Sequence, residues 1–193
     1  ETIDKISNEL TPMVATARLI KQEHPDASVV FIGPCASKKL EASRRTVRSD
    51  VDFVITFEEL TGMFEAKGIL LDEIKAMDEM KDATAAGRGY GVAGGVANAI
   101  KECIEQYYPG TPVNIQHAES LAECKKALLL AKAGKMNGCL IEGMACPGGC
   151  IAGAGTNIAI PVAARAVDKF KNEAEKKVPD ESVDQEMVEL EKE

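Results

Sequence analysis

Residues 27–32 read Ala-Ser-Val-Val-Phe-Ile, a short continuous apolar run that ends at Gly33 and Pro34. Such a run, rich in β-branched residues, is typical of a strand buried in a parallel sheet. It follows residues 10–23, whose apolar spacing predicts a helix. Because Cys35 comes directly after the turn, the predicted strand leads into a loop that carries a potential metal ligand.

The same order of helix and strand signals recurs along the chain. Further strands are predicted at residues 51–55, 113–116 and 138–142. Thr56 with Glu59, and Ser120 with Glu123, have the spacing of a capping box, which predicts that a helix begins at each pair. Strands that alternate with helices predict an α/β fold with a mostly parallel sheet flanked by helices.

The composition limits the possible functions. The 193 residues are 45% apolar and 28% charged, with a formal net charge of -8. That charge argues against nonspecific nucleic-acid binding, and no apolar run reaches the roughly 18 residues of a membrane span. We therefore expect a cytoplasmic protein. Since the sequence begins without methionine, we expect either a processed chain or part of a longer protein. We expect one domain fragment over 1–171 and a charged tail or linker over 172–193.

Three of the six cysteines lie in loops that follow predicted strands. Cys146 and Cys150 enclose Pro-Gly-Gly, and Cys35 follows the first strand. Open α/β sheets bind ligands at the carboxyl ends of their strands, and cysteine thiolates are the usual ligands of iron–sulfur clusters. The glycines would let the backbone approach a cluster closely. The spacing also fits a turn with two buried thiols, and Cys35 by itself fits a lone buried cysteine.

Several further residues could contribute to a metal site or to proton transfer. Lys38 would favour the thiolate form of a nearby cysteine, and Glu41 could relay a proton, although a solvated helix start explains both equally well. The glycine-rich stretch 87–95 lacks a preceding strand and a phosphate-binding lysine, so we interpret it as a packing or cluster-facing turn. We interpret the other three cysteines, Cys103, Cys124 and Cys139, as structural. We expect no metal site at His24 or His117.

Two segments resemble the signatures of a known family. Residues 34–41, Pro-Cys-Ala-Ser-Lys-Lys-Leu-Glu, resemble the second signature of iron-only (di-iron) hydrogenases, and residues 142–150, Glu-Gly-Met-Ala-Cys-Pro-Gly-Gly-Cys, resemble the third. Residues 50–60 and 94–96 also resemble that family's catalytic domain. The resemblance covers roughly residues 8–160, and two signatures in the proper order are more specific than either by itself.

The resemblance implies an H-cluster, which joins a four-iron four-sulfur cubane to a di-iron unit. The implied cubane ligands are Cys35, Cys146 and Cys150. Cys150 would also bridge to the di-iron unit. Lys38 would hydrogen-bond a cyanide ligand of that unit, since a cation suits an anionic ligand. Met144 would pack beside the same unit, and Glu41 would lie on the proton route.

The sequence also departs from the family pattern. The first signature, a Thr-Ser-Cys-Cys-Pro segment that supplies the fourth cubane thiolate and a proton-delivering cysteine, is expected upstream of residue 1. Gly33 stands where catalytic members have methionine, and Ala152, Ala154 and Thr156 replace residues of a usual Asn-Gly-Gly-Gly-Gln-Pro stretch. These changes resemble the divergent branch that is regarded as sensory. We expect this chain by itself to be inactive and to hold no H-cluster.

Our leading interpretation is therefore a fragment of the catalytic domain of an iron-only hydrogenase. The complete protein would oxidise, produce or sense dihydrogen, exchanging protons and electrons in the cytoplasm of an anaerobe. Its partner would be a ferredoxin-like electron carrier or a fused signalling domain. The alternative is a non-catalytic iron–sulfur scaffold or assembly protein built on the same fold.

Overall fold

The chain forms two compact units. The computed structural model describes residues 2–44, 49–75 and 83–179. Of these, unit 1 comprises 2–6, 83–152 and 158–179, and unit 2 comprises 7–44, 49–75 and 153–157. The chain therefore leaves unit 1 after Ala152 and returns to it after Asn157. Within the described ranges, no helix combines the length and apolar character that a membrane span requires.

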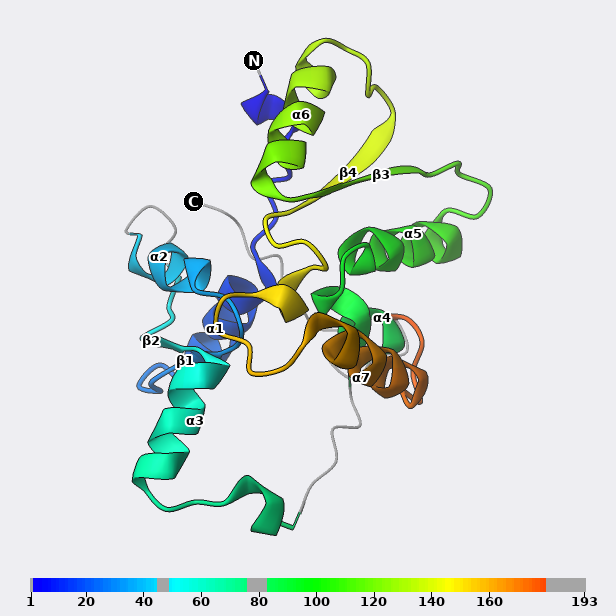
Figure 1. The fold of residues 1–193 in the computed structure, drawn as a ribbon. Helices are drawn as coiled ribbons and strands as arrows, with labels where there is room; N and C mark the ends of the chain where they lie inside the picture. Colours follow the sequence, from blue (N-terminus) through cyan, green and yellow to red (C-terminus); the bar gives the residue numbers. More distant parts are fainter. Residues whose placement is uncertain (1, 45–48, 76–82, 180–193) are drawn as a thin grey trace. The chain divides into compact units, whose positions relative to one another are not determined.

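Unit 2 contains the first pair of strands (Figure 1). Its elements are α1 (Pro12–Glu23), β1 (Val30–Ile32), α2 (Ser37–Ser43), β2 (Phe53–Ile55), α3 (Phe57–Ala66) and the 3-10 turn η2 (Leu71–Glu73). Strands β1 and β2 pair in parallel, with Val30 opposite Phe53. These two side chains remain 43% and 62% exposed, so the sheet has an apolar face open to solvent.

The core of unit 2 lies between α1 and the opposite face of this sheet. Val14 and Ala17, three residues apart and hence on one side of α1, are each 1% exposed. Phe31 and Val54, the central residues of the two strands, pack against this cluster. The predicted amphipathic helix and the strand signals are thus confirmed.

Strand β1 is shorter than the predicted run of residues 27–32. The N–H of Val29 donates to the Asp52 carboxylate at 2.7 Å, so the regular ladder begins one residue later. This hydrogen bond from Val29, followed by one from Lys21 of α1, holds the pKa of Asp52 below its usual value. The carboxylate therefore links the start of the sheet to helix α1.

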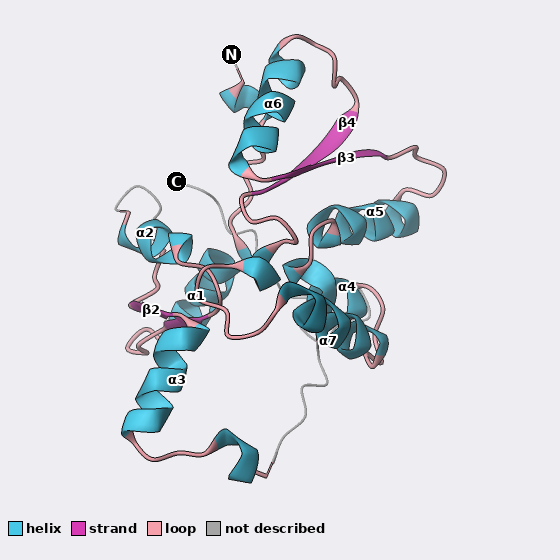
Figure 2. Cartoon of the chain, viewed as in Figure 1, coloured by secondary structure: helices cyan, strands magenta, loops and turns pink. Residues whose placement is uncertain are grey.

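Unit 1 contains the second pair of strands. Its elements are η1 (Ile3–Lys5), α4 (Ala85–Arg88), η3 (Gly89–Gly91), α5 (Gly95–Tyr107), β3 (Asn114–Glu119), α6 (Leu121–Lys132), β4 (Cys139–Met144), η4 (Cys150–Ala152) and α7 (Ile160–Asn172). Strands β3 and β4 pair in parallel with His117 opposite Glu142. Helix α6 contacts both strands, and α4 packs against α5 and α7 (Figure 2).

The predicted α/β class is confirmed, and all four predicted strands are present. Both pairings are parallel, as the sequence indicated. The described strands form two two-stranded sheets, one in each unit, where the sequence had suggested a single sheet. Strand periodicity cannot reveal this division, because it reports which residues face a core and not which strands share one.

The capping box predicted for α3 is confirmed. Thr56 Oγ1 accepts the N–H of Glu59 at 3.2 Å, and Glu59 Oε2 accepts the N–H of Thr56 at 2.8 Å. Lys39 of α2 also donates to Glu59 at 2.6 Å. The bond from Lys39, and then the bond from the Thr56 backbone, lower the pKa of Glu59 from its ordinary 4.5 to about 2.

The capping box predicted for α6 is wrong in one half. Ser120 Oγ accepts the N–H of Glu123 at 3.3 Å, as expected. The Glu123 carboxylate, however, accepts the N–H of Glu119 at 2.8 Å. The N–H of Ser120 is already used, because it donates to the carbonyl of Met144 at 2.8 Å and so extends the β3–β4 ladder.

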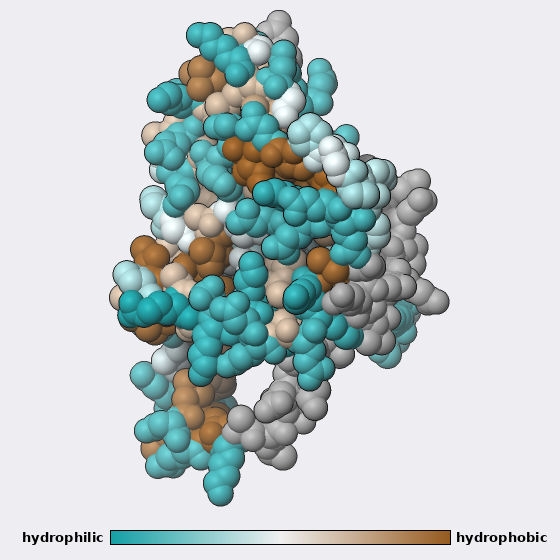
Figure 3. All heavy atoms as spheres, turned by 90° about the vertical axis from the view of Figure 1, so that its right-hand side faces the viewer, coloured by the Kyte–Doolittle hydropathy of each residue, from teal (hydrophilic) through white to brown (hydrophobic). Residues whose placement is uncertain are grey.

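Both units expose large apolar side chains. Examples are Met63 and Phe53 in unit 2, and Leu121 and Leu129 in unit 1. On the face drawn in Figure 3, apolar residues form small groups between hydrophilic ones. Parallel strands are normally covered on both faces, so the exposed side of the β1–β2 sheet is unusual for this class.

Candidate functional site

The loop after β4 contains two of the predicted ligands. Cys146 is half-buried and Cys150 is exposed, and none of the six cysteines forms a disulfide. Gly148 and Gly149, between them, have φ angles of 93° and 90°. These angles lie in the left-handed region that glycine adopts without a steric penalty. The Pro-Gly-Gly sequence thus turns the chain tightly between the two thiols.

The glycine-rich turn packs against this cysteine loop. A Cβ atom on Gly149 would collide with the Ala93 nitrogen and lie 2.8 Å from the Gly91 oxygen. The N–H of Ala93 donates to the carbonyl of Gly148 at 3.1 Å. The stretch 87–95 is therefore a packing turn that supports the loop between Cys146 and Cys150.

Tyr90 lies within the same glycine-rich turn. Burial raises the pKa of its phenol, and the nearby Cys103 raises it further. The phenol therefore remains neutral at physiological pH and adds no negative charge to the turn.

Glu142 is a buried carboxylate at the centre of this arrangement, with a side chain only 6% exposed. Oε2 accepts the N–H of Gly94 at 2.6 Å. Oε1 accepts the N–H groups of Val96 and Ala97 at 3.0 and 3.1 Å. These donors form the N-terminus of α5, where a helix favours negative charge. Across the strand pair, His117 Nδ1 lies 3.3 Å from Oε2.

Glu119, the last residue of β3, reaches the cysteine loop directly. Its Oε2 accepts the N–H of Gly148 at 2.8 Å. Neither Glu119 nor His117 was identified as a site residue from the sequence. Their positions follow from the register of β3 against β4, which pairs Glu119 with Met144 and His117 with Glu142. Local sequence signals carry no information about that register.

The Cys35 loop belongs to unit 2 and is held differently. Cys35 lies between β1 and α2 and is half-buried. The N–H of Gly33 donates to Ile55 at 3.1 Å, and the carbonyl of Pro34 accepts the N–H of Gly155 at 2.9 Å. A Cβ atom on Gly155 would overlap Thr56, so residues 153–157 lie tightly against this part of unit 2.

Lys38 and Glu41 form an ion pair beside that loop. Lys38 Nζ lies 2.6 Å from Glu41 Oε2, and both side chains are 22% exposed. The Thr11 hydroxyl donates to Glu41 Oε1 at 2.6 Å. Thr11 is the N-cap residue of α1, yet its side chain makes no capping hydrogen bond. Sequence analysis missed Thr11 because its partner lies 30 residues away.

The other three cysteines lie in the elements predicted for them. Cys103 is in α5, Cys124 in α6 and Cys139 at the start of β4. The Cys124 thiol lies 3.5 Å from the Ala118 carbonyl, and Asn114 donates to the Cys139 sulfur at 3.3 Å. Cys124 and Cys139 are half-buried, and these local contacts suit a structural role within the sheet and its covering helix.

The predicted site residues are divided between the two units. Cys35, Lys38 and Glu41 lie in unit 2, and Met144, Cys146 and Cys150 lie in unit 1. Within neither unit do the described residues bring together three His, Cys, Asp or Glu side chains as a metal site. The donors themselves suit a cubane, because thiolates are its usual ligands and none of these thiols forms a disulfide. The two thiols of the loop after β4 are also separated by glycines, whose backbone can approach a cluster closely.

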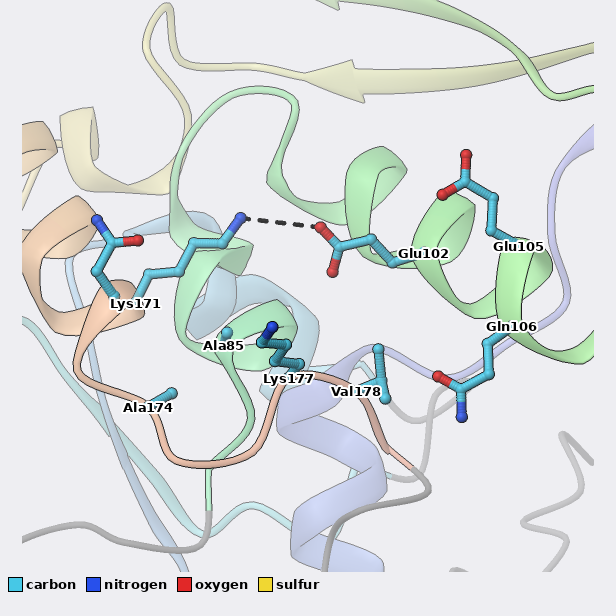
Figure 4. A pocket seen from close by; sticks show the side chains of 9 residues that line it. Ala85, Glu102, Glu105, Gln106, Lys171, Ala174, Lys177 and Val178 are labelled. Carbon is cyan, nitrogen blue, oxygen red and sulfur yellow. Dashed lines mark ion pairs between the residues drawn. The ribbon is translucent and has the colours of Figure 1, made fainter.

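A pocket of about 510 Å³ lies elsewhere in unit 1 (Figure 4). It is lined by Ala85, Glu102, Glu105, Gln106, Lys171, Asn172, Ala174, Lys177 and Val178. Figure 4 shows the Lys171 ammonium directed at Glu102, 4.0 Å away. The segment after α7 forms one wall, where the N–H of Ala85 donates to the Lys176 carbonyl at 2.8 Å. The predicted cluster ligands are not among the lining residues.

Comparisons with known proteins agree with the signatures. Residues 1–154 match the family model of the iron only hydrogenase large subunit, C-terminal domain. Iron hydrogenase 1 of Clostridium pasteurianum is 25% identical over 196 residues, covering 80% of this chain and 34% of that protein. The cytosolic Fe-S cluster assembly factor NAR1 of Kluyveromyces lactis is 40% identical over 63 residues, covering 33% of this chain and 13% of that protein.

Solved structures show the same fold. The FeFe-hydrogenase HydA1 from Chlamydomonas reinhardtii superimposes with a TM-score of 0.60 at 20% sequence identity. The match covers 89% of this chain and 62% of the algal chain. The chain thus spans about a third of the Clostridium protein and less than two thirds of the algal structure.

Proposed function

This chain belongs to the family of iron only hydrogenase large subunits, C-terminal domain, and on that premise we propose that it contributes most of the protein ligands of an H-cluster. The complete protein would oxidise, produce or sense dihydrogen. The observation that supports this most strongly is the loop between Cys146 and Cys150, in which two thiols flank glycines with positive φ.

Cys35, Cys146 and Cys150 would hold the cluster as thiolates. When bound, the cluster would supply an electron conduit through its four-iron four-sulfur part and a dihydrogen site on its di-iron part. The protein's own contribution in unit 1 is a loop without side-chain obstruction, because Gly148 and Gly149 present only backbone. Met144, half-buried at the end of β4, would pack beside the di-iron unit.

Lys38 would hydrogen-bond a cyanide ligand of the di-iron unit, and Glu41 would lie on the proton route. The Lys38 ammonium is held in place by Glu41 at 2.6 Å, which orients a cation near the Cys35 loop. Both Glu41 oxygens accept hydrogen bonds, from Lys38 and from Thr11. A proton passing through Glu41 would therefore compete with Lys38 and Thr11 for the carboxylate oxygens.

The wider assignments are also proposals. We place the complete protein in the cytoplasm of an anaerobe, with protons, dihydrogen and a ferredoxin-like electron carrier or a fused signalling domain as partners. Residues 1–171 would be the part that belongs to the H-cluster domain, and 172–193 a charged tail or linker. The replacements at Gly33, Ala152 and Ala154 support a hydrogen sensor over a rapid catalyst.

One observation favours a second candidate function. The match to the iron–sulfur assembly factor, although confined to 63 residues, is 40% identical, against 25% for the Clostridium hydrogenase. A non-catalytic iron–sulfur scaffold or assembly protein on the same fold would account for the cysteine loops without any di-iron chemistry.

Dihydrogen uptake by the complete, matured protein tests the first proposal. Cys150→Ala should abolish uptake together with the infrared bands of carbonyl and cyanide ligands. The matched control is Cys139→Ala, which truncates a cysteine of the same unit that we interpret as structural, and it should retain both signals. Uptake that survives Cys150→Ala would rule out the di-iron assignment. An iron–sulfur absorbance without uptake or infrared bands in the unmutated protein would instead support the scaffold.

A further inference from the structure

We propose that Glu142 and Glu119 are positioning residues that set the geometry of the loop between Cys146 and Cys150. The proposal rests on the proposed function, since it is cluster binding that makes the separation of these two thiols important. Each carboxylate accepts hydrogen bonds from backbone N–H groups at or next to the loop.

Glu142 ties the cysteine-bearing strand to the glycine-rich turn. It lies on β4, four residues before Cys146, and accepts the N–H groups of Gly94, Val96 and Ala97. Because its side chain is only 6% exposed, water cannot readily replace a lost partner. This carboxylate therefore helps to set the spacing between β4 and the end of the turn.

The turn transmits that spacing to the loop. The N–H of Ala93, next to Gly94, donates to the carbonyl of Gly148 at 3.1 Å. The backbone of Gly91 and Ala93 lies so close to Gly149 that a single added methyl group would collide. A shift of the turn would therefore be passed to Gly148 and Gly149, the residues that separate the two thiols.

Glu119 holds the same peptide from the other side. Its carboxylate accepts the N–H of Gly148 at 2.8 Å, while the Gly148 carbonyl accepts from Ala93. Both polar groups of Gly148, midway between the cysteines, are thus engaged by other segments. The N–H of Gly149 closes the turn by donating to the Cys146 carbonyl at 3.0 Å.

Glu59 provides a matched control in unit 2. Like Glu142, it accepts a backbone N–H at the start of a helix, in this case that of Thr56. Its side chain is 50% exposed and it belongs to the unit without Cys146 and Cys150. If Glu142 only capped a helix, shortening either glutamate would affect Cys146 and Cys150 equally little.

The test measures iodoacetamide alkylation of each cysteine in the reduced 193-residue chain, by mass spectrometry. The variants are Glu142→Asp, Glu119→Asp and the control Glu59→Asp. Aspartate keeps the negative charge, so thiolate formation is not favoured by loss of a nearby anion. It shortens the side chain and breaks the hydrogen bonds to the backbone.

We expect Glu142→Asp and Glu119→Asp to raise the alkylation rate of Cys146, which is half-buried, about tenfold relative to Cys124 and Cys139. That factor corresponds to loss of roughly one hydrogen bond to a charged group. Glu59→Asp should leave these ratios unchanged. Unchanged ratios in both unit 1 variants would overturn the proposal, as would an equal rise at all three cysteines, which signals general unfolding. The measurement needs no cluster, so its failure would leave the proposed function to the uptake test.

Discussion

The two cysteine loops are held in place by different parts of the chain. Around Cys146 and Cys150, nearly every restraint acts on the backbone, through glycines with positive φ and through two carboxylates that accept N–H groups. Beside Cys35, backbone hydrogen bonds are joined by two side-chain ion pairs, Lys38 with Glu41 and Lys39 with Glu59. The first loop should therefore be sensitive to added volume, and the second to changes of charge and pH.

The largest effect is expected from Gly149→Ala. The added methyl group would overlap the Ala93 nitrogen and force alanine into a left-handed conformation. Together these should lower the free energy of unfolding by about 3 kcal/mol, measured by urea denaturation. Gly110→Ala is the control, because Gly110 also has positive φ but has no atom within 4 Å of the added carbon. It should cost about 1 kcal/mol, and equal losses would disprove the close packing.

Glu142→Gln should follow with a loss of about 2 kcal/mol. One amide oxygen cannot serve all three backbone donors, and the new NH₂ group would face either Gly94 or the N–H groups of Val96 and Ala97. Urea denaturation monitored by circular dichroism measures the change. Glu123→Gln, at an exposed residue of the same unit, should lower the free energy of unfolding by less than half as much. A similar loss in both variants would show that Glu142 contributes no more to stability than an exposed glutamate.

Thr11→Val should have a smaller effect, about 1 kcal/mol. Valine keeps the shape of threonine but cannot donate to Glu41. Thr11→Ser retains the hydroxyl and should keep most of the stability. A thermal unfolding comparison of the two variants decides the point, and a serine variant as unstable as the valine variant would show that the hydrogen bond contributes nothing.

The pH dependence of unit 2 should be the smallest effect. The pKa of Glu59 is lowered to about 2, and that of Asp52 is lowered as well. Their contribution to stability is thus fully present above about pH 4.5 and is lost as the pH falls toward about 2. An acid titration followed by NMR should show unit 2 signals weakening over this range. Glu59→Gln should flatten the profile, and an unaltered profile would contradict the assignment.

The sequence predicted the features that depend on nearby residues. The apolar runs gave the strands, and Thr56 with Glu59 gave the start of α3, because both signals lie within a few residues. The carboxylate contacts could not be predicted in this way. Glu142 meets Gly94 across 48 residues, and Thr11 meets Glu41 across 30. Likewise, the incomplete capping box at Ser120 reflects a partner, Met144, that only the strand pairing brings near.

The roles of the cysteines themselves remain the central claim, and iron content tests it most directly. Cys146→Ala and the control Cys139→Ala would be compared for iron and acid-labile sulfide in the complete protein, purified without oxygen. We predict that Cys146→Ala loses most of both, while Cys139→Ala keeps the content of the unmutated protein. Equal iron and sulfide in the two variants would contradict the assignment of Cys146 as a cluster ligand.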